Sequence, residues 1–189
     1  MIEIEGLSKC FGDLTAVNDI SLSVPKGEFF VILGPNAAGK TTTIKVMAGL
    51  MKPTRGSVHI CGYNIEEDPL NARKRMSYLP DFPFLYDKLT PIEFFRFTGQ
   101  LFGMAESDIK NESEYLSDRF SLGEFFFKPM ESLSHGTKQR VAIVSALMHA
   151  PELFVLDEPM VGLDPHHARV LKDILRERAD QGMTVFVST

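Results

Sequence analysis

The first third of the chain alternates apolar and polar side chains with a period of two. Residues 2–5 read IEIE and residues 20–24 read ISLSV, and the apolar run EFFVIL at 28–33 follows the turn residues PKG at 25–27. Alternation predicts half-buried strands, and a short apolar run after a turn predicts a buried strand. A further strand is expected at 58–61, VHIC, so these pieces should form a small antiparallel sheet.

Helical periodicity begins directly after the apolar run at 28–33. The segment TTTIKVMAGL occupies residues 41–50. A helix there would place four apolar side chains on one face, namely Ile44, Met47, Ala48 and Met51. The sequence therefore predicts a strand, a short loop and an amphipathic helix in succession.

A phenylalanine-rich segment at 81–133 has the character of helices. Thr90 is placed to cap a helix with Pro91 in its first position, and Ser107 is placed to cap a second helix over 107–120. The aromatic side chains have two interpretations: most would fill the core of a helical subdomain, and an exposed subset would contact a partner. They include Phe84, Phe94, Phe95, Phe97 and Phe102.

Beyond residue 134 the pattern switches between helix and strand. The elements expected in order are a helix over 136–150, a strand at 153–157, a helix over 164–181 ended by Gly182, and a strand at 183–188. Strands that alternate with helices imply a parallel sheet with right-handed crossovers.

The predicted fold class is α/β, with a mostly parallel sheet, an N-terminal antiparallel β subdomain and an inserted helical subdomain. We expect one domain over 1–189. Within it, residues 1–80 form the β subdomain and the first part of the core, residues 81–133 the helical subdomain, and residues 134–189 the rest of the core.

Charge and composition narrow the classes of partner. Lys plus Arg number 20 and Asp plus Glu number 25, so the net charge of −5 gives no reason to expect nucleic acid. No apolar stretch approaches the ~18 residues that span a bilayer, and the N-terminus lacks the pattern of a signal peptide. We therefore expect a soluble, cytoplasmic chain. Cys10 and Cys61 are too few for a zinc site and are expected to be buried thiols, with a disulfide as the less favoured alternative.

Residues 33–42, LGPNAAGKTT, carry the first chemical motif. The spacing Gly-x-x-x-x-Gly-Lys-Thr is filled by Gly34, Gly39, Lys40 and Thr41. Such a loop turns backbone N–H groups toward a phosphate chain at a helix N-terminus. Lys40 would reach the β- and γ-phosphates, and Thr41 would offer its hydroxyl to Mg²⁺. A plain turn with a lysine is the alternative, but the predicted strand, loop and helix favour a P-loop NTPase.

Two carboxylates end the predicted strand at 153–157. Asp157 and Glu158 lie at its carboxyl end, the edge where parallel sheets bind ligands. Asp157 is expected on the metal side of a nucleotide, and Glu158 is placed to accept a proton from an attacking water. A solvated acidic turn is the alternative, disfavoured by the apolar run before it. The Asn-Lys-x-Asp stretch of guanine-specific proteins is absent.

Residues 132–165, SLSHGTKQRVAIVSALMHAPELFVLDEPMVGLDP, closely resemble the ATP-binding cassette (ABC) family. LSHGTKQR stands where that family has its Leu-Ser-Gly-Gly-Gln signature, and the acidic strand and the GLDP loop follow at the usual distances. The resemblance spans the chain and implies that Phe11 stacks on adenine, Asp157 assists Mg²⁺ through water and Glu158 polarises the attacking water. The implied phosphate cradle consists of Gly34, Pro35, Asn36, Ala37, Ala38, Gly39, Lys40, Thr41 and Thr42.

The resemblance also implies a head-to-tail dimer with a second ABC subunit. Ser134 and Gly136 would contact the γ-phosphate of the nucleotide on the opposite subunit, and Asp164 belongs to the loop that joins the two sites. ATP binding would close the pair and hydrolysis would open it. A membrane-spanning permease subunit would dock in a groove between the helical subdomain and the loop of Asp81.

Several positions depart from the family pattern. Ala37 replaces the usual middle glycine of the P-loop, which is tolerable if its φ is negative. His135 and Thr137 replace a Gly and the Gln of the signature, and the pattern LSxGTKQR is similar to ABC exporters of the second type, which export drugs, polysaccharides or lipids. Asp81 stands where the family has a glutamine. It keeps an acceptor for Mg²⁺ or water, which makes it a catalytic and metal-side candidate, but it loses the amide donor.

The favoured function is an ATPase that uses ATP and Mg²⁺ to power export, from the cytoplasmic face of the membrane. A soluble ABC ATPase acting on ribosomes or DNA is the alternative, although its usual tandem cassettes, inserts or basic extensions are lacking. A third possibility, a module that closes on ATP without hydrolysis, is disfavoured by Glu158. A metal site at His166 and His167 is disfavoured because adjacent helical residues point in different directions.

The chain stops at Thr189, within the strand that ends FVST. In the family this strand runs into a histidine that contacts the γ-phosphate, and further elements complete the sheet. We therefore expect a fragment of a longer protein that, alone, binds ATP weakly, hydrolyses it slowly and tends to aggregate through its exposed edge.

Overall fold

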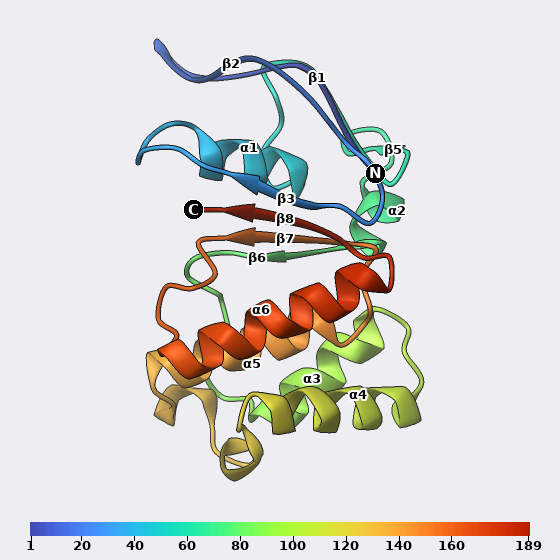
Figure 1. The fold of residues 1–189 in the computed structure, drawn as a ribbon, viewed down its shortest axis with the longest axis vertical. Helices are drawn as coiled ribbons and strands as arrows, with labels where there is room; N and C mark the ends of the chain where they lie inside the picture. The colour runs from blue at the N-terminus through green and yellow to red at the C-terminus, as the bar shows by residue number, and fades with distance from the viewer. The chain divides into compact units, whose positions relative to one another are not determined.

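The computed structural model describes residues 1–189, and the chain divides into two compact units (Figure 1). The first unit contains residues 1–78, 151–159 and 177–189, and the second contains residues 79–150 and 160–176. This division differs from the boundaries expected at 80 and 133. The helix that follows residue 134 packs against two helices of the phenylalanine-rich segment and therefore belongs to the second unit.

An antiparallel sheet in the first unit shows the predicted alternation of buried and exposed side chains. Its order is β2–β1–β4–β5, with bounds Leu14–Val24, Ile2–Phe11, Arg55–Ile60 and Tyr63–Asn64. Ile2 pairs with Val24 on one side and with Ile60 on the other, and all three side chains are fully buried. One face of this sheet therefore belongs to the core.

The first unit also contains a parallel sheet, whose strands lie side by side in Figure 1. Its order is β3–β8–β7–β6, with bounds Phe29–Ile32, Thr184–Ser188, Leu153–Asp157 and Met76–Leu79. Strand β8 is parallel to β3 and to β7, and every residue of β7 and β8 is buried. This burial explains why both segments are continuously apolar. Strand β6 was not predicted.

Helix α1 (Lys40–Met47) packs between the two sheets of the first unit. Its Ile44 and Met47 side chains are fully buried in one cluster with Ile4 of the antiparallel sheet and Phe186 of the parallel sheet. The short helix α2 (Pro69–Lys74), also not predicted, is capped by Asp68. The predicted stripe of α1 is thus the contact that joins the two sheets.

The second unit is helical. Helix α3 (Pro91–Leu101) begins as predicted, because the Thr90 hydroxyl accepts from the Glu93 N–H and the Glu93 carboxylate accepts from the Thr90 N–H. Helix α4 (Glu106–Arg119) has Ala105 at its N-cap, so the prediction that Ser107 caps it was wrong. Ser107 lies inside the first turn, where its hydroxyl bonds Asp108.

Two 3₁₀ turns lead to the remaining helices. They are η1 (Gly123–Phe125) and η2 (Met130–Ser132), followed by α5 (His135–Leu147) and α6 (Pro165–Asp180), whose last residues belong to the first unit. The phenylalanines divide between the two predicted roles. Phe94 and Phe95 are buried, Phe97 and Phe102 are partly exposed, and Phe84 is 83% exposed.

No helix is both long and apolar enough to cross a membrane. Cys10 and Cys61 are free and are half-buried rather than buried. The expectation of buried thiols was therefore wrong: Cys10 lies near the end of β1, and Cys61 follows the last residue of β4.

Candidate nucleotide-binding site

The P-loop joins β3 to α1 as its spacing predicts. Gly39 is the N-cap of α1 with φ 85°, and a Cβ there would overlap the carbonyl oxygen of Ala16. Only glycine therefore fits this position, since it tolerates both the backbone angle and the close approach. The loop ends at the N-terminus of α1, where the first backbone N–H groups of a helix have no partner within the helix, which is the geometry of an anion site.

Ala37 adopts a left-handed conformation with φ 66°. Alanine would be free of strain here only if its φ were negative. That condition is not met. The left-handed conformation costs an L-residue with a Cβ about 1–2 kcal/mol. The loop keeps the turn that the family usually makes with glycine and stores a small strain at Ala37.

Lys40 is buried at the start of α1, and its ammonium lies inside the loop. Its Nζ donates to the carbonyl oxygen of Gly34 and to that of Pro35, the latter at 3.2 Å. A lysine held in this way is a cation placed among the donors of an anion site. Thr41, the next residue, is exposed.

A cavity of about 470 Å³ opens over this loop. Its lining includes every loop residue from Pro35 to Thr42, together with Leu14, Thr15, Ala16, Phe11 and Glu158. The Phe11 ring is 46% exposed at the end of β1, with Lys9 Nζ 5.1 Å from its centroid. The first unit therefore brings together three predicted elements: a phosphate loop, an aromatic ring and a carboxylate.

Asp157 and Glu158 lie where β7 ends beside β8. Asp157 is buried; its Oδ1 accepts from Ser188 Oγ at 2.5 Å, and its Oδ2 has no hydrogen-bond partner. Glu158 has φ 46°, and its N–H lies 3.3 Å from the carbonyl oxygen and from the hydroxyl of Ser188. Such an angle is unusual for a non-glycine residue and often marks a functional position. Ser188, which sequence reasoning missed, holds both acidic residues.

The signature residues lie in the second unit, at the start of α5. Ser134 is the N-cap, and its Oγ accepts from the Thr137 N–H at 3.2 Å. A Cβ on Gly136 would lie 2.9 Å from the carbonyl oxygen of Gly162, so glycine is required by the close approach of that loop. The ring of His135 lies against Gly162 as well. The signature turn and the loop at 160–164 are therefore in direct contact.

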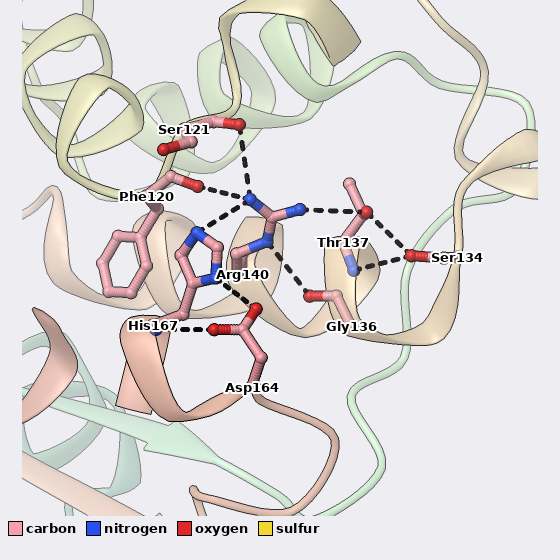
Figure 2. Close-up of polar contacts among 8 residues, drawn as sticks. All are labelled: Phe120, Ser121, Ser134, Gly136, Thr137, Arg140, Asp164 and His167. Atoms are coloured by element: carbon pink, nitrogen blue, oxygen red, sulfur yellow. Dashed lines mark hydrogen bonds and ion pairs between the residues drawn. The ribbon is translucent and has the colours of Figure 1, made fainter. Parts of the chain in front are cut away.

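Asp164 caps α6 and takes part in a polar network that Figure 2 shows. Its Oδ1 accepts from the His167 N–H at 3.0 Å, and its Oδ2 lies 2.6 Å from His167 Nδ1. These backbone and side-chain hydrogen bonds lower the pKa of Asp164 to about 2. His167 Nε2 lies 3.1 Å from Arg140 Nη1. Sequence reasoning missed Arg140 and considered His167 only as a weak metal candidate.

Asp81 is partly exposed in the second unit, where its Oδ1 accepts from the Phe82 N–H at 2.9 Å. The predicted site residues thus fall into two groups. Phe11, the P-loop, Asp157 and Glu158 belong to the first unit, and Ser134, Gly136, Asp164 and Asp81 to the second.

Residues 17–161 match the sequence profile of the family described as ABC transporter. The chain belongs to the ABC transporter family. It is 35% identical over its whole length to the linearmycin resistance ATP-binding protein LnrL of Bacillus subtilis and 36% identical to the SkfA peptide export ATP-binding protein SkfE of the same organism. It spans 61% of the length of LnrL and 78% of that of SkfE.

The fold of this chain is also similar to solved structures of ABC ATP-binding domains. The ATP-binding subunit of an ABC transporter superposes with a TM-score of 0.94 at 34% identity, covering all of this chain and 78% of the other. A dimeric ATP-binding cassette in a post-hydrolysis state, bound to ADP and Pi, gives 0.87 at 25% identity, covering all of this chain and 88% of the other. These likenesses confirm the predicted P-loop α/β fold of an ABC domain.

Proposed function

We propose that this ABC domain binds ATP at the cavity over its P-loop and hydrolyses it to power export through a separate membrane subunit. The observation that carries the proposal is that Glu158, an acidic residue, lines the same cavity as the P-loop. A carboxylate beside a phosphate site is the arrangement that a hydrolase needs, and a module that only closes on ATP does not need it.

ATP binding would use the P-loop and the Phe11 ring, which both line the cavity. Phe11 would stack on adenine, and the backbone N–H groups of residues 34–42 would surround the phosphates. Lys40 Nζ, now on loop carbonyls, would add a charge-assisted hydrogen bond to the β- and γ-phosphates.

A magnesium ion fits the residues at this site. Asp157 Oδ2 is buried without a partner, and Thr41 adds a hydroxyl from the start of α1; such hard oxygen donors are what Mg²⁺ prefers. When bound, Mg²⁺ would neutralise charge on the phosphate oxygens. Asp81, whose Oδ1 accepts from the Phe82 N–H, stays a prediction from the sequence as a further acceptor toward Mg²⁺ or water.

Hydrolysis would proceed by in-line attack of water on the γ-phosphorus. Glu158 would accept a proton from this water as the new P–O bond forms, while the bond from the γ-phosphorus to the β–γ bridging oxygen breaks and ADP leaves. The constrained backbone of Glu158, tied to Ser188, would keep the carboxylate in place. The products are ADP and phosphate.

The second unit would complete the site of a head-to-tail partner subunit. Ser134 and Gly136 would donate to the γ-phosphate on that partner, because they lie at the N-terminus of α5. The dimeric ABC neighbour bound to ADP and Pi supports this assembly. The export direction is supported by the LSxGTKQR pattern and by the peptide export protein SkfE, both of which favour it over a role on ribosomes or DNA.

Binding is tested by nucleotide titration of the complete protein with Lys40→Ala, beside the control Lys45→Ala in the last turn of α1. Losing a charged hydrogen bond should weaken ATP binding by about tenfold to a hundredfold in Lys40→Ala only. Equal affinity in both variants would refute the assignment of this cavity to ATP.

A further inference from the structure

Arg140 connects three segments of the second unit (Figure 2). Its guanidinium donates to the Phe120 carbonyl oxygen at 2.6 Å, at the end of α4, and to the Gly136 carbonyl oxygen and Thr137 Oγ1 at the start of α5. Nη1 also lies 3.1 Å from His167 Nε2, on α6. The signature turn is therefore linked through one side chain to the helix that follows the loop at 160–164.

The chemistry of these groups fixes the protonation of His167. A guanidinium has donors only, so His167 Nε2 must accept and can carry no hydrogen. The neutral ring then carries its hydrogen on Nδ1, which donates to Asp164 Oδ2 at 2.6 Å. The His167 side chain is only 12% exposed, whereas that of Asp164 is 57% exposed. One largely covered imidazole therefore bridges the carboxylate of the loop to the guanidinium of the signature helix.

We propose that His167, in its Nδ1–H form, is a positioning residue that holds the loop at 160–164 and the signature turn in one fixed arrangement. The inference rests on the proposed function, in which the signature turn contacts the nucleotide of the partner subunit. Gly136 and Gly162 approach so closely that a Cβ on Gly136 would lie 2.9 Å from the Gly162 carbonyl oxygen, so a small shift of the loop would displace the signature backbone. Misplacement by about 1 Å can cost two orders of magnitude in rate.

Two opposing effects act on the pKa of Arg140 at this bridge. Burial lowers the pKa of Arg140, while the negative charges of Asp164 and Glu124 oppose that effect. The ring of His166 lies 5.1 Å from that of His167 and is exposed, and His166 reaches Asp164 through its backbone N–H. His166 therefore provides a matched control: it has the same side chain on the same helical turn without the bridge.

The test uses the complete protein in a Glu158→Gln background, in which ATP binds without turnover. His167→Phe fills the space but removes the bridge, and His167→Gln restores an acceptor and a donor on one amide. We expect ATP affinity of the monomer to stay within twofold in every variant. ATP-driven dimerisation should weaken about tenfold in His167→Phe and return to within twofold in His167→Gln and in the control His166→Phe.

Equal dimerisation of His167→Phe and its parent would overturn the positioning role. A parent that stays monomeric with ATP would instead overturn the proposed function, and the positioning role with it. If His167→Phe does not fold, the inference is tested on the wild-type protein instead. Its ¹H–¹⁵N spectra should show that the His167 imidazole carries a hydrogen on Nδ1 and none on Nε2. A hydrogen on Nε2 excludes the bond to Arg140 and overturns the inference.

Discussion

Ser188 Oγ donates a hydrogen bond of 2.5 Å to Asp157 Oδ1, joining the ends of two neighbouring parallel strands. Both side chains are buried, and the same hydroxyl lies 3.3 Å from the Glu158 N–H. A single serine thus orients the carboxylate proposed for the metal side and the backbone of the proposed base. The contact spans 31 residues of sequence.

Replacing Ser188 by alanine should therefore affect both stability and turnover. The buried Asp157 carboxylate loses the hydroxyl that donates a hydrogen bond to its Oδ1. The free energy of unfolding, measured by urea titration, should therefore fall by about 1–3 kcal/mol. The control is Thr184→Val on the same strand, which removes a hydroxyl that accepts from the Gly27 N–H. Thr184→Val should lose stability but keep the turnover of the folded protein, whereas Ser188→Ala should lose both. Equal turnover in the two variants would contradict the assigned role of Ser188.

The left-handed backbone of Ala37 predicts the sign of a stability change. Ala37→Gly removes the strain of φ 66° and should raise the free energy of unfolding by up to about 1 kcal/mol, after the entropy cost of glycine is subtracted. Ala38→Gly, at the next position, pays only that cost and should lower stability by about 0.5–1 kcal/mol. Thermal unfolding of both variants measures the difference, and two losses of equal size would show that Ala37 is unstrained.

An aromatic group in the second unit is the proposed contact with a membrane subunit. Tyr86 packs edge-on against Phe84 at 5.8 Å and Phe97 at 5.6 Å, and Phe84 is 83% exposed. Phe84→Ser should leave the free energy of unfolding and the basal ATPase rate nearly unchanged, because little surface is buried. It should abolish stimulation by the membrane subunit in the assembled transporter. Phe127→Ser, at another exposed aromatic, should keep that stimulation; loss in both variants would argue against a specific surface.

Burial and the nearby Glu152 charge raise the pKa of Cys61 to about 11. Because the thiolate is the reactive form, iodoacetamide should label Cys61 in the folded protein at pH 8 about a hundredfold more slowly than in the urea-unfolded chain. The rate should rise about tenfold per pH unit from pH 8 to 10, since the thiolate fraction grows in that proportion. Mass spectrometry of the peptide measures both rates. A folded-state rate independent of pH would contradict the raised pKa.

Local sequence signals predicted much of the fold because their causes are local. The Thr90 cap before Pro91, the P-loop spacing and the apolar strand at 153–157 each depend on neighbouring residues only. Helix α2 and strand β6 were missed because six and four residues are too few to show a period. Ser107 was misplaced because a serine inside a first helical turn resembles one at the cap.

The missing parts of the site come from long-range contacts. Ser188 meets Asp157 only because β8 inserts between β3 and β7, and Arg140 meets His167 only because α5 and α6 lie in one unit. The positive φ of Ala37 and of Glu158 is set by the surrounding loops and has no sign in the residue type. Motif spacing can name the residues of a site, but tertiary structure decides which neighbours hold them.

The central claim, that ATP joins two subunits and that Glu158 hydrolyses it, is tested most directly by sedimentation velocity of the complete Glu158→Gln protein. Without nucleotide it should be a monomer, and with saturating ATP and Mg²⁺ it should become a stable dimer, because binding is retained and the proton acceptor is lost. Adding Lys40→Ala to the same protein should raise the ATP concentration that the dimer requires by about tenfold to a hundredfold. A Glu158→Gln protein that stays monomeric at saturating ATP, or that hydrolyses ATP at the wild-type rate, would contradict the account.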